Sequence, residues 1–364
     1  MTKSSYLGID LFAGSGGISY GLSQAGFDMR LGIEIDPNFA VTLKENNKNM
    51  KVVVSDIRVI DPAEVVKSSG LRKKDINLIV GGPPCQGFSQ SNRRSRNLDN
   101  PLNNLYKEFF RFIRVLQPQV FLLENVAGLK TLHRGAVFQD ILKTGEKVGY
   151  YVQWDVVNAE DFGVPQRRKR IIFIGTKQKT DNLFYVKKNK PVTVRSALDD
   201  LPILENGNAV GESKYSQDGK LSNYQKMMRK NNGNIVSNNL VTRNSALVVE
   251  RYKYIPPGGN WKNIPPHLMS NYKNPDNCHG WIYYRLRWDE PSVVISNFRK
   301  NMLIHPEQHR GLSVREAARL QSFPDQYIFY GPLGSQQQQV ANAGPPLLVE
   351  KMGNNIMKYL REVN

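Results

Sequence analysis

Short apolar runs alternate with segments of helical periodicity through the first 176 residues of the chain. The apolar runs that predict strands are residues 6–11, 29–33, 52–54, 76–80, 120–123 and 170–175. Helical segments separate most of them, and one of these segments places Phe109, Phe112, Ile113 and Leu116 on a single face. Strands that alternate with helices are typical of a mostly parallel sheet covered by helices on both faces. We therefore predict an α/β fold built on a doubly wound, mostly parallel sheet.

The middle of the chain has a different character. Residues 177–305 are dense in Asn and Lys, contain Pro-Gly turns and lack helical periodicity. They carry 20 basic and 10 acidic side chains, out of 50 and 32 in the whole chain, which makes them the most basic segment per residue. We predict a smaller, loop-rich domain with a few short strands. Its charge suits a polyanionic partner, although a solvated, lysine-rich surface would look the same.

Helical signals return near the end of the chain. Ser313 and Glu316 have the spacing of a capping box, before a helix that Pro324 stops. Apolar residues at four-residue intervals predict a last helix over residues 348–361. The two predicted domains are therefore residues 1–176 together with 306–364, and residues 177–305.

Cysteine content and hydropathy limit where the protein acts. The only cysteines are Cys85 and Cys278, too few for a disulfide framework or a cysteine-based zinc site. No run approaches about 18 consecutive apolar residues, and the first residues have no signal-peptide pattern. We expect a soluble cytoplasmic protein that binds neither a membrane nor a metal.

Carboxylates and glycines follow the first three predicted strands. The turn DLFAGSGG at residues 10–17 lets a ligand approach the backbone at a helix N-terminus, although alone it suits NAD or tight packing equally well. Glu34 can accept hydrogen bonds from ribose hydroxyls. Asp56 can accept from an adenine amine, unless both carboxylates are ordinary surface groups. Because the turn has no basic residue for a diphosphate, S-adenosylmethionine suits it better than NAD.

Cys85 and Glu124 follow the next two core strands. Cys85 lies in the segment GGPPCQGFS, directly after the strand predicted over residues 76–80. A lone cysteine there is more often a small buried side chain than a nucleophile. Glu124, however, must be satisfied locally or face a cleft. A thiolate beside an acid suits one reaction well: addition to carbon 6 of cytosine, with nitrogen 3 held by the acid, makes carbon 5 nucleophilic enough to take a methyl group.

Five motifs, in order, resemble those of the DNA (cytosine-5)-methyltransferases of bacterial restriction-modification systems. They are DLFAGSGG, GGPPCQGFS, ENV at residues 124–126, QRRKR at residues 166–170 and RGLSVREAARLQSFP at residues 310–324. The resemblance covers nearly the whole chain except residues 177 to about 290. It implies a Rossmann-like, S-adenosylmethionine-dependent catalytic domain and a smaller target-recognition domain. The implied activity is methyl transfer to carbon 5 of a cytosine flipped out of a short duplex site, which protects the DNA from a cognate endonuclease.

The resemblance also implies roles for individual residues. Cys85 would be the nucleophile, and Glu124 would contact the cytosine amine and nitrogen 3. Arg168 and Arg170 would support the active-site loop and touch the cytosine carbonyl. The cofactor would contact Phe12, Gly14, Gly16, Gly17, Glu34, Ile35, Asp56, Ile57, Pro84 and Asn342. DNA would contact Ser89, Ser91, Arg93 and Arg94 after the cysteine, and Arg243, Arg285 and Arg287 in the second domain, where arginine can read guanine or hold phosphate.

The late motif departs from the family's pattern. The family reads Gln-x-Gly-Asn-x-Val-x-Pro, whereas residues 339–346 read QVANAGPP, with Ala341 and Gly344 in place of the glycine and the valine. The methyl group of Ala341 could tighten this turn, which puts the cofactor contact of Asn342 in question.

Three other functions fit parts of the sequence. An RNA enzyme on the same scaffold is disfavoured because the Cys-Phe-Thr triplet of the tRNA-modifying branch is absent. A non-catalytic DNA-binding relative is disfavoured by the intact Cys85, Glu124 and Arg170. An NAD enzyme is disfavoured by the missing phosphate-binding pattern. We therefore expect an enzyme that acts as a monomer on double-stranded DNA.

Overall fold

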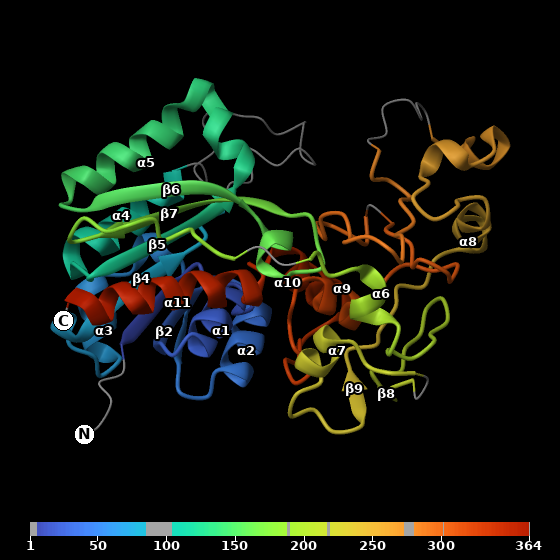
Figure 1. The fold of residues 1–364 in the computed structure, drawn as a ribbon, viewed down its shortest axis with the longest axis horizontal. Helices are drawn as coiled ribbons and strands as arrows, with labels where there is room; N and C mark the ends of the chain where they lie inside the picture. Colours follow the sequence, from blue (N-terminus) through green and yellow to red (C-terminus); the bar gives the residue numbers. More distant parts are fainter. Residues whose placement is uncertain are drawn as a thin grey trace. The chain divides into compact units, whose positions relative to one another are not determined.

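The computed structural model describes residues 6–84, 104–187, 190–216, 219–272, 280–300 and 302–363. The chain forms two compact units (Figure 1). Unit 1 consists of Met1–Phe162, Lys169–Lys188 and Gly344–Asn364, and unit 2 consists of Gly163–Arg168 and Asn189–Ala343. Each unit therefore combines segments that are distant in the sequence.

Unit 1 is built on a seven-stranded sheet with the order β3-β2-β1-β4-β5-β7-β6. Its strands are β1 (Leu7–Leu11), β2 (Asp28–Glu34), β3 (Lys51–Val54), β4 (Ile76–Gly81), β5 (Val120–Val126), β6 (Tyr151–Asn158) and β7 (Lys169–Thr176). Neighbouring strands from β3 to β5 are parallel, whereas β7 is antiparallel to both β5 and β6. The predicted mostly parallel sheet is confirmed. Chain order reverses between β1 and β4, the position at which open α/β sheets bind their ligands.

Helices cover both faces of this sheet. On one face α3 (Pro62–Ser68), α4 (Leu105–Leu116) and α5 (Ala136–Lys147) share a hydrophobic core with the strands. On the other face lie α1 (Gly17–Gln24), α2 (Pro37–Asn46) and α11 (Pro346–Val363) (Figure 1). The first and last of these pack closely because Gly21 has no side chain: a Cβ there would lie 2.5 Å from the carbonyl oxygen of Pro346. The predicted helix over residues 348–361 is confirmed and extends further at both ends.

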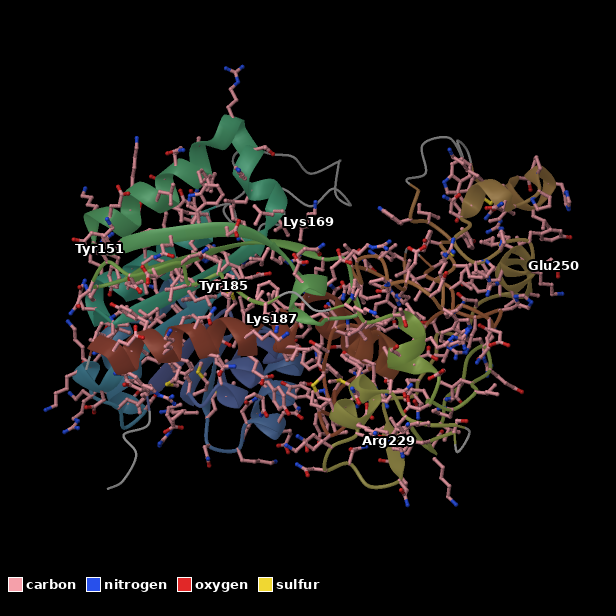
Figure 2. The ribbon with its side chains drawn as sticks, viewed as in Figure 1. Tyr151, Lys169, Tyr185, Lys187, Arg229 and Glu250 are labelled. Atoms are coloured by element: carbon pink, nitrogen blue, oxygen red, sulfur yellow. The ribbon has the colours of Figure 1, made fainter. Side chains whose placement is uncertain are left out.

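The segment after β7 belongs to unit 1, beyond the boundary predicted at residue 176. Gln153 on β6 donates from Nε2 to the carbonyl of Thr180 at 2.9 Å. Asn355 on α11 donates to the carbonyls of Leu183 and Tyr185 at 2.8 and 3.0 Å. The side chain of Tyr185 itself is exposed (Figure 2). These backbone contacts tie the segment to the sheet and to the last helix.

Unit 2 contains short helices and one small hairpin. The helices are α6 (Val194–Leu198), α7 (Asn223–Met228), α8 (Ala246–Lys253), α9 (Val314–Leu320) and α10 (Leu333–Asn342), and β8 (Glu212–Lys214) pairs antiparallel with β9 (Ile235–Ser237). The predicted short strands are confirmed, and the short helices α6, α7 and α8 also lie in residues 177–305, where the sequence shows no helical periodicity. None of the helices in the described ranges is both long and apolar enough to cross a membrane.

The predicted capping box is confirmed at the start of α9. The Oγ of Ser313 accepts from the backbone N–H of Glu316 at 3.1 Å, and Glu316 Oε2 accepts from the N–H of Ser313 at 2.7 Å. Arg310 completes the arrangement by donating from Nη1 and Nη2 to the two oxygens of Glu316, at 2.8 and 2.7 Å. All three side chains are buried.

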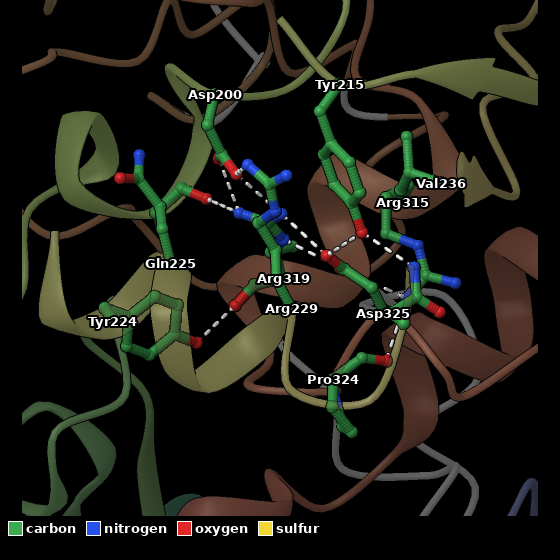
Figure 3. Close-up of polar contacts among 12 residues, drawn as sticks. Asp200, Tyr215, Tyr224, Gln225, Arg229, Val236, Arg315, Arg319, Pro324 and Asp325 are labelled. Atoms are coloured by element: carbon green, nitrogen blue, oxygen red, sulfur yellow. Dashed lines mark hydrogen bonds and ion pairs between the residues drawn. The ribbon is translucent and has the colours of Figure 1, made fainter. Parts of the chain in front are cut away.

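A buried ion-pair network holds α9 within unit 2 (Figure 3). Arg319 pairs with Asp200 and Asp325, each at 2.7 Å, and all three side chains are buried. Tyr215 donates its hydroxyl to Asp325 at 2.7 Å. Residues 306–343 therefore pack with unit 2, although the sequence placed them with the α/β domain. The functional division into cofactor-binding and DNA-binding domains stays a prediction.

Candidate active site

The glycine-rich turn between β1 and α1 has a strained and open backbone. Gly14 and Gly16 have φ angles of 57° and 90°, and a Cβ added at Gly14 would meet nothing within 4 Å. Phe12 also lies in the left-handed region, with φ at 62°, a costly conformation that clusters at functional sites. Gly16 caps α1 without a side-chain hydrogen bond, and Gly17 begins the helix. The turn therefore leaves open space beside Gly14 for a ligand near a helix end.

Glu34, the last residue of β2, is tied to this turn. Its Oε2 accepts from the backbone N–H of Gly14 at 2.7 Å, and its Oε1 accepts from that of Asp36 at 2.8 Å. The side chain is buried, and this burial raises the pKa of the carboxyl above its usual value although the backbone N–H groups of Asp36, Gly14 and Ile35 oppose the shift. A carboxylate has about four lone-pair sites, so these N–H groups do not use its whole capacity. The remaining capacity suits a hydroxyl donor such as one on a ribose.

The predicted adenine contacts differ in what they offer. Ile35 is 62% exposed although it directly follows a buried strand, so a flat apolar group can lie against it. Asp56 accepts from Nε and the backbone N–H of Arg58 at 3.0 and 2.9 Å, and these bonds lower the pKa of its carboxyl. The side chain of Ile57 is buried and packs in the hydrophobic core. Its contact with a cofactor stays a prediction.

Glu124 and Arg170 form an ion pair at the carboxyl end of β5. In the antiparallel register Glu124 lies opposite Ile172 and Val126 lies opposite Arg170, so the side chains of Glu124 and Arg170 point to the same face. Nε of Arg170 lies 2.7 Å from Oε1 of Glu124, and both side chains are largely buried. Burial lowers the pKa of the Arg170 guanidinium, against the opposing effect of the carboxylate.

The approach to Cys85 lies against this ion pair. A Cβ added at Gly82 would lie 3.3 Å from Oε2 of Glu124, so the second carboxylate oxygen faces the turn after β4. Asn125 donates from Nδ2 to the carbonyl of Pro83 at 3.0 Å in a buried contact. Pro84, the last described residue before the gap, is partly exposed. Cys85 itself lies outside the described residues, and the role of Pro84 at the cofactor stays a prediction.

Arg168 is buried and holds the late motif within unit 2. Its Nη1 donates to the carbonyl of Ile295 at 3.1 Å, and its Nη2 donates to those of Ala341 and Ala343 at 3.2 and 3.1 Å. The last two carbonyls flank Asn342, whose exposed side chain accepts from Nε2 of Gln338 at 2.6 Å. These contacts give Arg168 a positioning role. They do not support the prediction that it touches the cytosine carbonyl.

Packing against Ile18 explains why Gly344 stands where the family has a valine. A Cβ added at Gly344 would lie 3.1 Å from Cγ1 of Ile18, and a Cβ added at Gly82 would lie 3.9 Å from Cδ1 of the same isoleucine. Ile18, in the first turn of α1, therefore fills space between the late motif and the approach to the cysteine. Gly344 and Ile18 are sterically complementary.

Arg285 has a structural role, and its contacts do not support its prediction as a DNA contact. The side chain is buried, and its five N–H donors are used inside unit 2. They meet the carbonyls of Tyr252, Ile255, His305 and Gln308 at 2.6 to 2.9 Å, and Nδ1 of His309 at 3.0 Å. With every donor engaged, the guanidinium has none left for a base or a phosphate.

The other predicted DNA contacts stay predictions. Arg287 is 43% exposed and pairs with Asp289 and Glu290, at 3.1 Å in each case, and Arg243 is exposed. The remaining four, Ser89, Ser91, Arg93 and Arg94, lie outside the described residues.

Asp10, the residue before the last one of β1, was not predicted as a site residue. Its side chain is fully buried, and Oδ2 accepts from the hydroxyl of Ser19 at 2.5 Å. Oδ1 has no hydrogen-bond partner among the described residues. Burial raises the pKa of this carboxyl to about 7. An acidic residue inside an otherwise apolar strand was the available signal.

Comparison with known proteins is consistent with this geometry. The family model described as C-5 cytosine-specific DNA methylase matches residues 6–358. The chain is 35% identical over 352 residues to the Type II methyltransferase M1.HphI of Haemophilus parahaemolyticus, covering 96% of this chain and 86% of the relative. It is 34% identical over 380 residues to M.DdeI of Desulfomicrobium norvegicum, covering 98% and 89%. A crystal structure described as a DNA modification methyltransferase encoded within an E. coli prophage superposes with a TM-score of 0.79 at 30% identity, covering 98% of this chain and all of that one.

The sheet, the open glycine turn and the carboxylate–guanidinium pair define an α/β enzyme with its site at the carboxyl edge of parallel strands. With the family match over nearly its whole length, the chain belongs to the C-5 cytosine-specific DNA methylase family. It is a DNA (cytosine-5) methyltransferase.

Proposed function

We propose that this enzyme transfers a methyl group from S-adenosylmethionine to carbon 5 of a cytosine in a short, specific duplex sequence. The Cys85 thiolate adds covalently to the flipped-out base. The observation that carries this proposal is the 2.7 Å ion pair between Glu124 and Arg170, beside the turn that leads to the cysteine. One carboxylate oxygen is held by the guanidinium and the other faces Gly82. An oriented acid next to a nucleophile is what activation of the cytosine ring requires.

The chemistry assigns a separate task to each of these groups. Addition of the Cys85 thiolate to carbon 6 moves ring electrons toward nitrogen 3 and carbon 5, and Glu124 stabilises the nitrogen side through a shared proton. Arg170 keeps the carboxylate oriented and offsets negative charge on the cytosine carbonyl. After carbon 5 has taken the methyl group, it loses its proton to a base and the thiolate leaves, which restores the ring. The thiolate must approach perpendicular to the ring, so the base first leaves the helical stack.

The residues around the glycine turn fit S-adenosylmethionine. Glu34 has accepting capacity left for a ribose hydroxyl, the space beside Gly14 is open, and Ile35 exposes apolar surface for an adenine ring. Arg58 engages both carboxylate oxygens of Asp56, so Asp56 would accept from the adenine amine by giving up a contact with this arginine. When bound, the cofactor supplies the sulfonium methyl group that carbon 5 attacks.

The biological role that we propose is modification of DNA in the cytoplasm of a bacterium that carries a restriction system. The two curated relatives described above bear the name Type II methyltransferase. Methylation of one short sequence would block cleavage there by a cognate endonuclease. The enzyme acts on duplex DNA as a monomer in this account.

Bisulfite sequencing tests the proposal. Plasmid DNA from cells that express the wild-type protein should contain unconverted cytosines at one recurring sequence, and DNA from cells with Cys85→Ala should contain none. Cys278→Ala, at the only other cysteine, is the matched control and should retain methylation. Methylation by the Cys85→Ala protein would contradict the covalent mechanism. Absence of methylation by the wild-type protein would contradict the proposed function.

A further inference from the structure

A cavity of about 140 Å³ lies in unit 2 at the start of α10. Polar and cationic side chains dominate its lining, which consists of Asn297, Phe298, Arg299, Lys300, Gly334, Gln337 and Gln338. They come from two segments, the loop after Ile295 and the first two turns of α10. Neither segment carries a predicted catalytic or DNA-binding residue.

The N-terminus of α10 opens into this cavity. The helix is 10 residues long, follows Pro332 and has no side-chain cap. The N–H groups of Ser335 and Gln336 donate to the carbonyl of Pro332 at 2.8 and 3.0 Å, while Gly334 lines the cavity and has no side chain to cover its own N–H. A helix N-terminus carries a partial positive charge of about half a unit, and its free N–H groups bind anions.

Two cationic side chains reach the same cavity. Their loop is anchored by Phe298, which is buried and whose carbonyl accepts from the N–H of Leu303 at 3.1 Å. Nη1 of Arg299 would lie 3.7 Å from a Cβ added at Gly334, so the guanidinium stands beside the helix N-terminus. Arg299 and Lys300 are both exposed, and neither is ion-paired within the described part of the chain. Among the residues that the structure describes, no carboxylate pairs with the positive charge at this point.

Gln337 supplies a second, independent observation at this cavity. Its side chain is 4% exposed and lines the cavity, and its Oε1 has no hydrogen-bond partner among the described residues. Its Nε2 donates to the hydroxyl of Thr242 at 2.8 Å. A hydroxyl both donates and accepts, so the amide can rotate by half a turn without losing that bond. Rotation would place an NH₂ donor where the unpartnered oxygen now lies.

We propose that this cavity binds one phosphodiester of the DNA backbone. The proposal rests on the proposed function, because it needs DNA as the substrate. Arg299, Lys300 and the N-terminus of α10 present donors or positive charge to one small space, and rotation of the Gln337 amide would add a further donor. Contacts of this kind hold DNA in register without reading its sequence. The site is distinct from the base-reading arginines that the sequence predicted.

Salt dependence of DNA binding provides the test. Dissociation constants for a duplex are measured by fluorescence anisotropy over a range of KCl concentrations, for the wild-type protein and for Arg299→Gln/Lys300→Gln. The matched control is Lys226→Gln/Lys230→Gln, which removes two exposed charges on and after α7 in the same unit. Each phosphate contact contributes about 0.9 to the slope of log K against log salt. We expect the slope of the first variant to fall by about 1 and that of the control to stay within about 0.3 of the wild type.

A second variant guards against a general effect of surface charge. Gln337→Glu is nearly isosteric and puts a buried negative charge at the cavity, so it should weaken DNA binding several-fold. The loss should be equal for duplexes with and without the methylated sequence. Thermal unfolding of each variant confirms that it is folded.

Three outcomes would overturn the proposal. In the first, the salt slope of the Arg299→Gln/Lys300→Gln variant matches that of the wild type. In the second, its slope changes by as much as that of the control variant. In the third, inorganic phosphate stabilises the protein in a way that depends on Gln337, while Gln337→Glu leaves the affinity for DNA unchanged. The last result would assign the cavity to a free anion. In all three cases the wild-type protein would still methylate duplex DNA, whereas failure of that reaction would remove the proposed function itself.

Discussion

Gly82→Ala is the most informative small change at the site. The added methyl group would lie 3.3 Å from Oε2 of Glu124 and 3.8 Å from its carbonyl oxygen, and 3.9 Å from Cδ1 of Ile18. The first distance is a few tenths of an ångström tighter than an ordinary contact, and the backbone of Gly82 is not in the left-handed region. The carboxylate must therefore shift slightly, while the surrounding core has room.

The expected result separates catalysis from stability. A displacement of about 1 Å at a reacting group can cost about a hundredfold in rate, so a shift of a few tenths should slow single-turnover methyl transfer by about tenfold. The free energy of unfolding should change by less than about 1 kcal/mol, because only one contact is tightened. Single-turnover transfer of labelled methyl groups and urea denaturation measure the two quantities.

Two neighbouring substitutions serve as controls for this prediction. Gly81→Ala would place its methyl group 2.5 Å from the carbonyl oxygen of Leu11, between β4 and β1, and should destabilise the fold by at least about 1–3 kcal/mol. Gly211→Ala meets nothing within 4 Å and should change neither quantity. The reasoning is refuted if Gly82→Ala transfers methyl groups at the wild-type rate, or if its stability falls as far as that of Gly81→Ala.

Three further predictions concern packing and charge. Gly344→Val, which restores the family's residue, should lower the free energy of unfolding by about 1–3 kcal/mol in the wild-type background. In the Ile18→Ala background the same substitution should cost at least about 0.5 kcal/mol less. Equal costs in the two backgrounds, measured by urea denaturation, would contradict steric complementarity. Glu316→Gln leaves the buried Arg310 without its counter-charge and should cost about 3–5 kcal/mol by urea denaturation, so a loss below about 1 kcal/mol would show that the pair is dispensable. Burial raises the pKa of Glu316, but the charge and hydrogen bonds of Arg310 outweigh this effect and lower the pKa to about 2. The stabilisation by this ion pair is therefore present above pH 4.5 and should be lost as the pH falls toward 2. Burial raises the pKa of Asp10 from 3.8 to about 7, so the native state keeps a proton that the unfolded state releases. The free energy of unfolding should therefore fall as the pH rises from about 4 to 7. If Asp10→Asn shows the same dependence of stability on pH as the wild type, this assignment is wrong.

Local sequence signals were sufficient for much of unit 1. The strand predicted over residues 76–80 is β4 (Ile76–Gly81), and the predicted apolar face of α4 is buried. The same holds for the capping box of Ser313 and Glu316, whose spacing defines the contact. In each case, the residues that determine the structure lie within a few positions of one another. Their partners did not have to be known.

Contacts between distant segments could not be predicted in the same way. Arg285 is polar by type, yet four carbonyls and the ring nitrogen of His309, about 20 to 30 residues away, engage all its donors. The buried residues of helix α8 include an arginine, Arg251. A search for apolar periodicity therefore does not reveal this helix. Arg170 and Glu124 were each predicted for the site, but their ion pair depends on the antiparallel register of β5 and β7. That register is set by the whole sheet.

The central claim is that Cys85 bonds to carbon 6 of the target cytosine. An oligonucleotide that carries 5-fluorocytosine at the methylated position blocks the final loss from carbon 5, because fluorine cannot leave as a proton does. Incubation with S-adenosylmethionine should give a denaturation-resistant adduct, and mass spectrometry of its peptides should place the DNA on Cys85. Absence of the adduct with a sequence that the enzyme methylates, or its formation at any other residue, would contradict the account.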